Sequence, residues 1–151
     1  SRKANKNAGI KKGDSYYWWQ FRNGGKRYSK ERPRPSQLTR SEFWSTYYSI
    51  QEAFEDDCRS DGAVGLVSAI QLAIDEMEQL KESTQEKYDN MEQAWPNGCP
   101  AMETLNEYIE KAGEVGDELQ SALSEAESID DDDTDEDIES RIEEIASSIS
   151  W

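Results

Sequence analysis

Two long amphipathic segments, separated by a short break that contains proline and glycine, limit what this chain can fold into. Within residues 63–94 and again within 101–129, apolar side chains recur in alternating steps of four and three residues. That spacing puts them on one stripe of a helix, as in helices that pack along each other. Residues 96–100, Pro-Asn-Gly-Cys-Pro, end the first helix and reverse the chain. We therefore predict an antiparallel helical hairpin whose narrow apolar stripes need a further cover.

Two shorter helices are expected before and after this hairpin. The sequence Thr39-Arg40-Ser41-Glu42 has the form of a capping box, with Thr39 as the N-cap. The helix that it opens carries a largely aromatic stripe formed by Phe43, Tyr47, Ile50 and Phe54. Residues 138–149 place Ile at steps of four, three and four. A helix that begins near Asp135 should therefore dock on the other helices or on a partner.

The N-terminal part contains an aromatic run, a glycine turn and a basic run, which together predict a β-hairpin. Residues 16–22 are mostly aromatic, and Asn-Gly or Gly-Gly supplies the positive φ values of a two-residue type I′ turn. An Asn23-Gly24 turn would place Trp19 opposite Tyr28, whereas a Gly24-Gly25 turn would place Phe21 there. Strand alternation puts Tyr17, Trp19 and Phe21 on one face, which we expect to pack on the aromatic stripe of the first helix.

The predicted fold class is α+β and mainly α. A small N-terminal antiparallel β-hairpin, or a three-stranded sheet if residues 9–13 add a strand, packs on a helix. A long antiparallel helical hairpin and a short C-terminal helix follow. Residues 1–8 are interpreted as a mobile arm, and Pro33 and Pro35 as a stiff spacer. We place one domain at residues 1–60, a basic module, and a second at residues 61–151, an acidic helical module.

Charge divides sharply along the chain. Residues 1–40 contain twelve Lys or Arg and two acids, whereas the remainder contains five bases and 31 acids. The first part therefore carries +10 and the rest −26, within a total of −16. A basic segment attracts phosphate, while an acidic one repels phosphate and attracts basic surfaces.

Several kinds of chemistry lack the residues they require. The chain has no histidine, which excludes imidazole bases and Ser-His-Asp or Cys-His catalysis. Cys58 and Cys99 form no zinc motif; we expect free buried thiols, with a disulfide as the alternative. The run Asp130–Asp137 lacks the glycine and glutamate that an EF-hand loop needs, so a solvated linker is expected. We predict no metal, no cofactor and no enzymatic activity.

The order of segments in the N-terminal third resembles that of a known family. The segments that carry the resemblance are Gly9–Gly13, Tyr16–Arg22, Gly24–Lys30 and a helix that opens near Thr39. Their order is similar to that of the AP2-like N-terminal domain of phage and transposon integrases. In that family a three-stranded sheet lies in the major groove of DNA and one helix packs behind it. The resemblance covers about residues 9–55 and implies DNA binding and a phage or mobile-element origin.

The first functional hypothesis is a small, non-enzymatic, phage-like nucleic-acid-binding protein, with DNA expected rather than RNA. Its acidic helices would serve homodimerisation or partner binding. Phosphate contacts and base stacking are assigned to the N-terminal module. The basic residues are Lys11, Lys12, Arg22, Lys26, Arg27, Lys30, Arg32 and Arg34, and the stacking residues are Tyr16 and Trp18.

Two alternatives stay open. The second hypothesis is an acidic helical inhibitor or adaptor that imitates nucleic acid and occupies a basic site on a host protein. The third is a virion assembly protein. No apolar run is long enough to span a membrane, and the polar N-terminal segment is unlike a signal peptide. We expect a cytoplasmic location, in a bacterial host cell if a phage encodes the protein.

Overall fold

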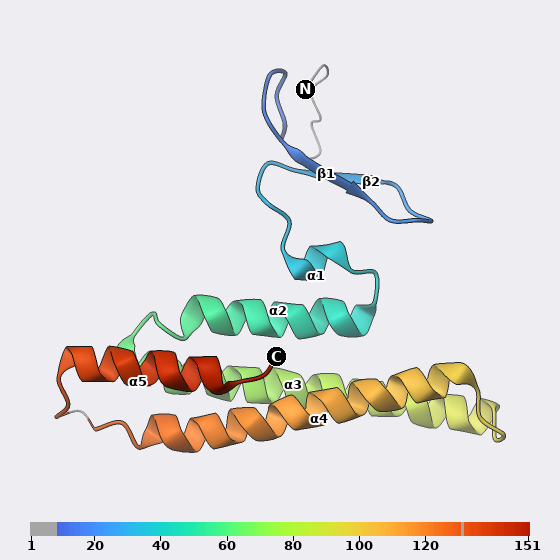
Figure 1. The fold of residues 1–151 in the computed structure, drawn as a ribbon. Coiled ribbons are helices and arrows are strands. Elements are labelled where there is room, and N and C mark those ends of the chain that lie inside the picture. Colours follow the sequence, from blue (N-terminus) through green and yellow to red (C-terminus); the bar gives the residue numbers. More distant parts are fainter. Residues whose placement is uncertain (1–8, 131) are drawn as a thin grey trace. The chain divides into compact units, whose positions relative to one another are not determined.

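The computed structural model describes residues 9–130 and 132–151, so the predicted arm at residues 1–8 lies outside the described part. Two strands, β1 (Tyr17–Gln20) and β2 (Lys26–Ser29), precede the helices (Figure 1). The helices are α1 (Pro35–Leu38), α2 (Glu42–Asp57), α3 (Gly62–Ala94), α4 (Pro100–Glu127) and α5 (Asp135–Ser148). The predicted mainly helical α+β fold is confirmed.

The chain forms two compact units, one that ends at Ser45 and one from Thr46 to Trp151. We call them the hairpin unit and the helical unit. The division falls inside α2, whereas we placed it after residue 60. Residues 46–60, with the greater part of the aromatic stripe, are therefore counted with the helical unit.

The two strands of the hairpin unit pair in a register that the glycine turn did not predict. Trp18 pairs with Tyr28 and Trp19 with Arg27, so both predicted registers were wrong. The loop between the strands spans residues 21–25, and Gly24 donates its N–H to the Phe21 carbonyl at 3.0 Å. Neither Gly24 nor Gly25 has a positive φ. The type I′ turn is therefore replaced by a longer loop that begins at an aromatic residue.

The sheet of the described chain has two strands, and Ile10 forms only an isolated bridge. Ile10 is nevertheless buried, with 2% of its surface exposed. Of the two predicted forms of the sheet, the described chain therefore has the two-stranded hairpin. The segment 9–13 contributes one anchoring side chain and no third strand.

The connection from the sheet to α2 contains helix and caps in place of a simple spacer. Pro35 opens α1, where its fixed φ suits the first helical turn and its missing N–H costs nothing. The Gln37 side chain accepts the Arg34 N–H at 3.0 Å. At α2 the cap is Ser41, whose hydroxyl accepts the Trp44 N–H at 3.4 Å. The predicted capping box on Thr39 was therefore wrong by two residues.

The helical unit is built on the α3–α4 hairpin. Its observed bounds differ from those of the predicted helices by at most two residues, because the apolar periodicity and the Pro-Gly break fix them. Six members of the predicted α3 stripe are buried: Leu66, Ile70, Ala73, Met77, Leu80 and Thr84. The α4 face that is buried is formed by Met102, Ala112, Val115, Leu119, Ala122 and Ala126. Its small residues let the two helices approach closely.

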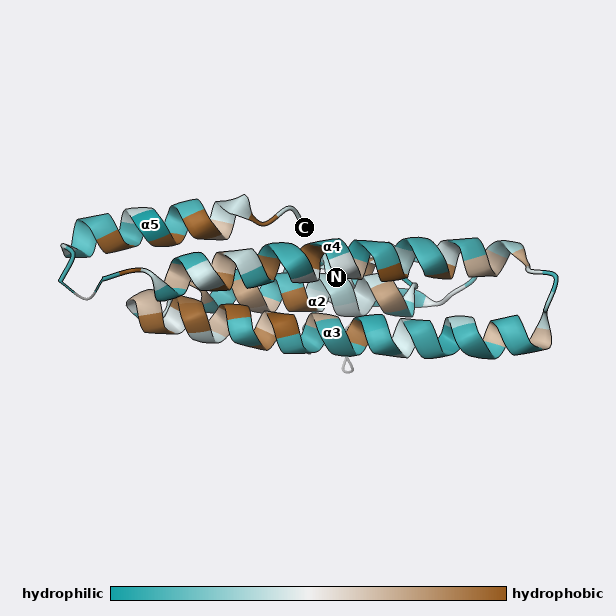
Figure 2. Ribbon diagram, turned by 90° about the horizontal axis from the view of Figure 1, so that it is seen from below, coloured by the Kyte–Doolittle hydropathy of each residue, from teal (hydrophilic) through white to brown (hydrophobic). Residues whose placement is uncertain are grey.

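The apolar core lies in the half of this hairpin away from its turn. Figure 2 shows hydrophobic residues concentrated where α2 and α5 flank the hairpin, and a mainly hydrophilic surface toward residues 95–99. No α3 residue beyond Thr84 is buried. The turn end is therefore a two-helix extension held by little apolar burial. No described helix is long and apolar enough to cross a membrane.

The C-terminal segment docks in cis onto α2 and α4. The Trp151 ring lies 5.5 Å from Phe54 and 6.3 Å from Tyr47, measured between ring centroids. The Ser150 N–H donates to a Glu118 carboxylate oxygen at 2.6 Å, and the Lys111 ammonium donates to the Ser150 carbonyl at 3.1 Å. The α2 stripe is buried as predicted, and Trp151 is a packing partner that the periodicity did not reveal.

Trp151→Ala should lower the free energy of unfolding by about 2 kcal/mol, because it removes two aromatic contacts and part of the cover of α2. Trp95→Ala is the matched control, since Trp95 lies at the hairpin turn and is 60% exposed. Urea denaturation followed by circular dichroism measures both changes. Equal losses in the two variants would show that Trp151 does not hold α5 in place.

Burial raises the pKa of Tyr47 to about 12, and Tyr48, Glu118 and Glu114 add to the rise. A raised pKa favours the neutral phenol in the folded state. The associated stability is complete below pH 10, the ordinary value, and is lost as pH rises toward 12. The free energy of unfolding should therefore fall over this interval in the native chain. Tyr47→Phe should remove much of the fall, whereas the exposed-site control Tyr17→Phe should keep it.

Candidate nucleic-acid interface

One face of the hairpin carries a row of aromatic rings with a lysine beside them. Trp18 and Tyr28 are cross-strand partners, so their side chains lie on the same face. The Tyr16 and Tyr28 rings are tilted against each other at 5.9 Å, and the Lys26 ammonium lies 5.0 Å from the centre of a Trp18 ring. We call Tyr16, Trp18, Lys26 and Tyr28 the aromatic face. Trp18 is 58% exposed and Tyr16 37%, so both rings are open to a ligand.

The opposite face is held together by cation–π contacts. The guanidinium carbon of Arg27 lies 5.6 Å from the centre of the Phe21 ring, and that of Arg40 lies 5.8 Å from it. Phe21 and Trp19 are partly buried. Tyr17 is 49% exposed, so its predicted place in a core was wrong. The two arginines therefore anchor the hairpin loop and add positive charge beside it.

Not every predicted basic residue contributes a free charge. Asp14 accepts the Lys11 N–H at 2.9 Å and forms an ion pair with the Lys30 ammonium at 3.1 Å. The pKa of Asp14 is lowered by that backbone hydrogen bond and, next, by Lys30. Asp14 is thus ionised at neutral pH and offsets the charge of Lys30. Asp14 is one of only two acids in residues 1–40, but its spacing from Lys30 did not predict the pair.

The remaining predicted residues do not gather into one patch. Lys11 and Lys12 are exposed on the segment before β1, and Arg22 is exposed in the loop at the tip of the hairpin. Arg32 and Arg34 are exposed on the connection that follows β2, at the other end of the hairpin from Arg22. Lys26 and Arg27 come from β2 itself and point to opposite faces. A phosphate backbone would have to follow the length of the hairpin to meet several of them.

The structure adds two residues to the predicted set. Tyr28 belongs to the aromatic face, and Arg40 extends the basic side through its contact with Phe21. The cross-strand pairing of Tyr28 could be read from the sequence only with the correct register. Arg40 was counted among the N-terminal charges, but the contact spans nineteen positions, and no local pattern predicts it.

The chain matches no known family model, no curated protein and no solved structure. The resemblance to AP2-like integrase domains therefore stays a prediction that rests on the residues of the N-terminal third. The three-stranded sheet that it implied is represented by two strands in the described chain.

Proposed function

We propose that this protein binds nucleic acid through the aromatic face of its hairpin, with DNA as the expected ligand. The observation that carries the proposal is Trp18, a ring 58% exposed on a paired strand with a lysine ammonium 5.0 Å away. Because more than half of its surface is exposed, the Trp18 ring can accept a stacked base, and Lys26, which lies over the ring, can meet the phosphate that follows. This pairing of ring and charge is how proteins hold single strands without reading sequence.

Strand geometry supports unpaired bases as the target. On a strand, residues two apart share a face and lie about 7 Å apart. Trp18 lies on β1 and pairs with Tyr28, and Tyr16, which immediately precedes β1, has its ring 5.9 Å from that of Tyr28. Flat rings on a sheet can each contact a separate base once the bases are unstacked. A duplex keeps its bases stacked and would offer such rings only its edges.

The second part of the proposal concerns the positive charges around the hairpin, which would contact phosphate. Lys12, Arg22, Lys26 and Arg27 are exposed around the hairpin. Their contacts with phosphate would release counterions, so binding should weaken as salt rises. These residues position the strand and carry no base preference.

Lys26→Ala with Arg27→Ala, made in the full chain, should weaken binding to a labelled single-stranded DNA of about 20 nucleotides. Fluorescence anisotropy between about 50 and about 200 mM NaCl gives the affinity and its salt slope, which should fall by about two in this variant. Lys81→Ala with Arg141→Ala removes the same charge from the helical unit and is the matched control. Binding that is absent, or independent of salt, would exclude the proposal.

Trp18→Ala should cost about 1–3 kcal/mol of binding free energy while leaving the salt slope unchanged, because stacking involves no counterion. Trp95→Ala, which removes an equally exposed ring from the helical unit, should bind as the native protein does. The same titration with duplex DNA and with single-stranded RNA ranks the ligands. Unchanged affinity of Trp18→Ala for every probe would rule out the aromatic face as the site.

A further inference from the structure

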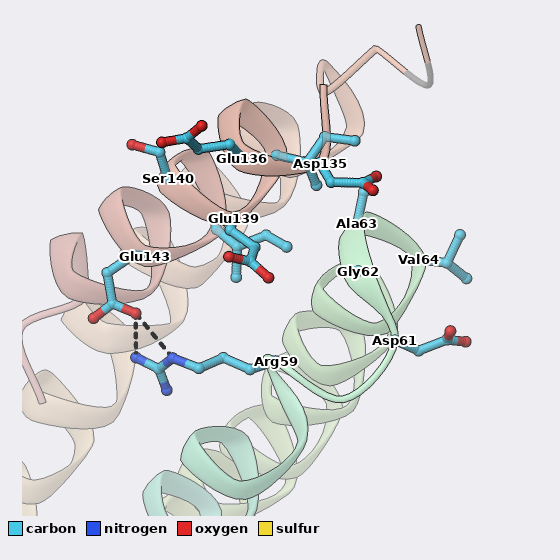
Figure 3. Close-up of a pocket in the computed structure, with 12 residues that line it drawn as sticks. Arg59, Asp61, Gly62, Ala63, Val64, Asp135, Glu136, Glu139, Ser140 and Glu143 are labelled. Atoms are coloured by element: carbon cyan, nitrogen blue, oxygen red, sulfur yellow. Dashed lines mark hydrogen bonds and ion pairs between the residues drawn. The ribbon is translucent and has the colours of Figure 1, made fainter. Parts of the chain in front are cut away.

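A groove in the helical unit lies between the first turn of α3 and the N-terminal part of α5. Its volume is about 730 Å³. Figure 3 shows α5 on one side, the start of α3 on the other and Glu139 directed into the space between them. The apolar part of the lining consists of Ala63, Val64, Ile138 and Ile142, and the acidic part of Asp61, Asp135, Glu136, Glu139 and Glu143. We call this site the α3–α5 groove.

The charge of the groove is almost entirely negative. Arg59 is the single base among the residues that line the groove. Its Nη2 and Nε atoms both lie close to Oε2 of Glu143, at 2.8 and 2.9 Å respectively. That ion pair links the connection between α2 and α3 to α5, and Glu143 offsets the positive charge of Arg59. Within the described residues, Asp61, Glu136 and Glu139 form no ion pair. A ligand that enters therefore meets several carboxylates without a counter-charge.

Helix dipoles account for only part of this acidity. Asp135 and Glu136 lie in the first turn of α5, and Asp61 immediately precedes α3, where negative charge is stabilising. Glu139 and Glu143 lie beyond the first turn, so the dipole does not explain them. They flank Ile138 and Ile142, which are four residues apart on the same helix. Ile142 is 5% exposed and belongs to the core, so the apolar surface that these acids border consists of the partly exposed Ile138 and, on α3, of Val64, which is 67% exposed.

We propose that the α3–α5 groove binds a short, basic, amphipathic helix of a partner protein. Two helices form the walls, and a third helix laid between them buries its apolar side on Val64, Ile138 and their neighbours. Lysine or arginine on the flanks of that helix would meet Glu139 and Glu136. The α5 wall runs from Asp135 to Glu143, which is about 12 Å, so two to three turns of partner helix fill it.

A second helical unit is a poor occupant of the same groove. Each of α3, α4 and α5 has far more acids than bases, so no described helix of this unit offers a basic side. Placing one of them in the groove would bring its carboxylates close to the carboxylates of the groove, which is unfavourable. The proposed partner is a different, basic protein, and the basic residues 1–40 of a second copy are the competing occupant that the test separates from it.

The test uses the full chain and a labelled synthetic peptide of about three helical turns. The peptide has leucines at positions i, i+4 and i+7 and lysines on both flanks. It should bind in fluorescence anisotropy. A peptide of the same composition, scrambled so that the leucines share no face, should bind at least tenfold more weakly. If the scrambled peptide binds equally well, the site is merely an acidic surface and the proposal fails.

Two pairs of variants locate the binding. Glu139→Lys should weaken binding of the amphipathic peptide at least tenfold. Glu82→Lys, the same change on α3 outside the groove, should leave the affinity unchanged. Val64→Ser should weaken it about fivefold, whereas Leu72→Ser, at another exposed apolar α3 position, should leave it unchanged. Circular dichroism checks that each variant folds. Equal effects within either pair would overturn the proposal.

Self-association is the remaining outcome to separate. Light scattering of the native chain and of Glu139→Lys shows whether a second copy, through its basic N-terminal segment, occupies the groove. An oligomer that dissociates in Glu139→Lys and excludes the peptide would replace the proposed partner with the chain itself. Loss of nucleic-acid binding in Trp18→Ala has no bearing on this result, because the two sites belong to different units.

Discussion

The apolar seam between α3 and α4 is the interaction on which the helical unit depends. The buried face of α3 includes Leu66, Ile70 and Met77, and that of α4 is rich in alanine. Both faces mix large and small residues, which can interdigitate over a long contact. Because the stripe is narrow, the seam alone leaves apolar edges, which α2 and α5 flank over half its length. The two shorter helices thus complete a core that the hairpin begins.

Acidic side chains surround this core and restrict how it can be completed. Trp151 and the Ser150 backbone close the C-terminal segment onto α2 and α4 through two rings, a carboxylate and a lysine. Arg59 performs the same task between the α2–α3 connection and α5. Bases are few in this unit, and two of them, Arg59 and Lys111, contribute these links. The acids beyond those links remain available to solvent or to a basic partner.

Sequence periodicity predicted the bounds of the long helices well, because these follow from local rules, but it predicted their buried faces only in part. On α4, Leu105, Ile109 and Leu123 were expected in the buried stripe and are only partly buried, whereas Val115 and Ala122 are buried and were not expected. Prediction from the sequence failed where two local signals competed. Thr39 and Ser41 both suit a cap, and the chain uses Ser41. The turn formers Asn23, Gly24 and Gly25 suggested a two-residue turn. The chain instead forms a longer loop over residues 21–25, which begins at Phe21, where Arg27 and Arg40 pack. The contacts of Trp151 and the Asp14–Lys30 pair depend on tertiary structure, and no spacing rule predicts them.

The opposite charges of the two ends bear on how the aromatic face can work. The acidic part carries −26 and repels nucleic acid at long range, while the basic part attracts it. At physiological salt both effects fall off within about 8 Å, so only charges near the bound strand act on it. One of the nearby lysines is already paired with Asp14. In the proposed binding mode, the exposed Lys12, Arg22, Lys26 and Arg27 would supply the part of the affinity that falls with salt, and stacking on Trp18 would supply the part that salt does not screen.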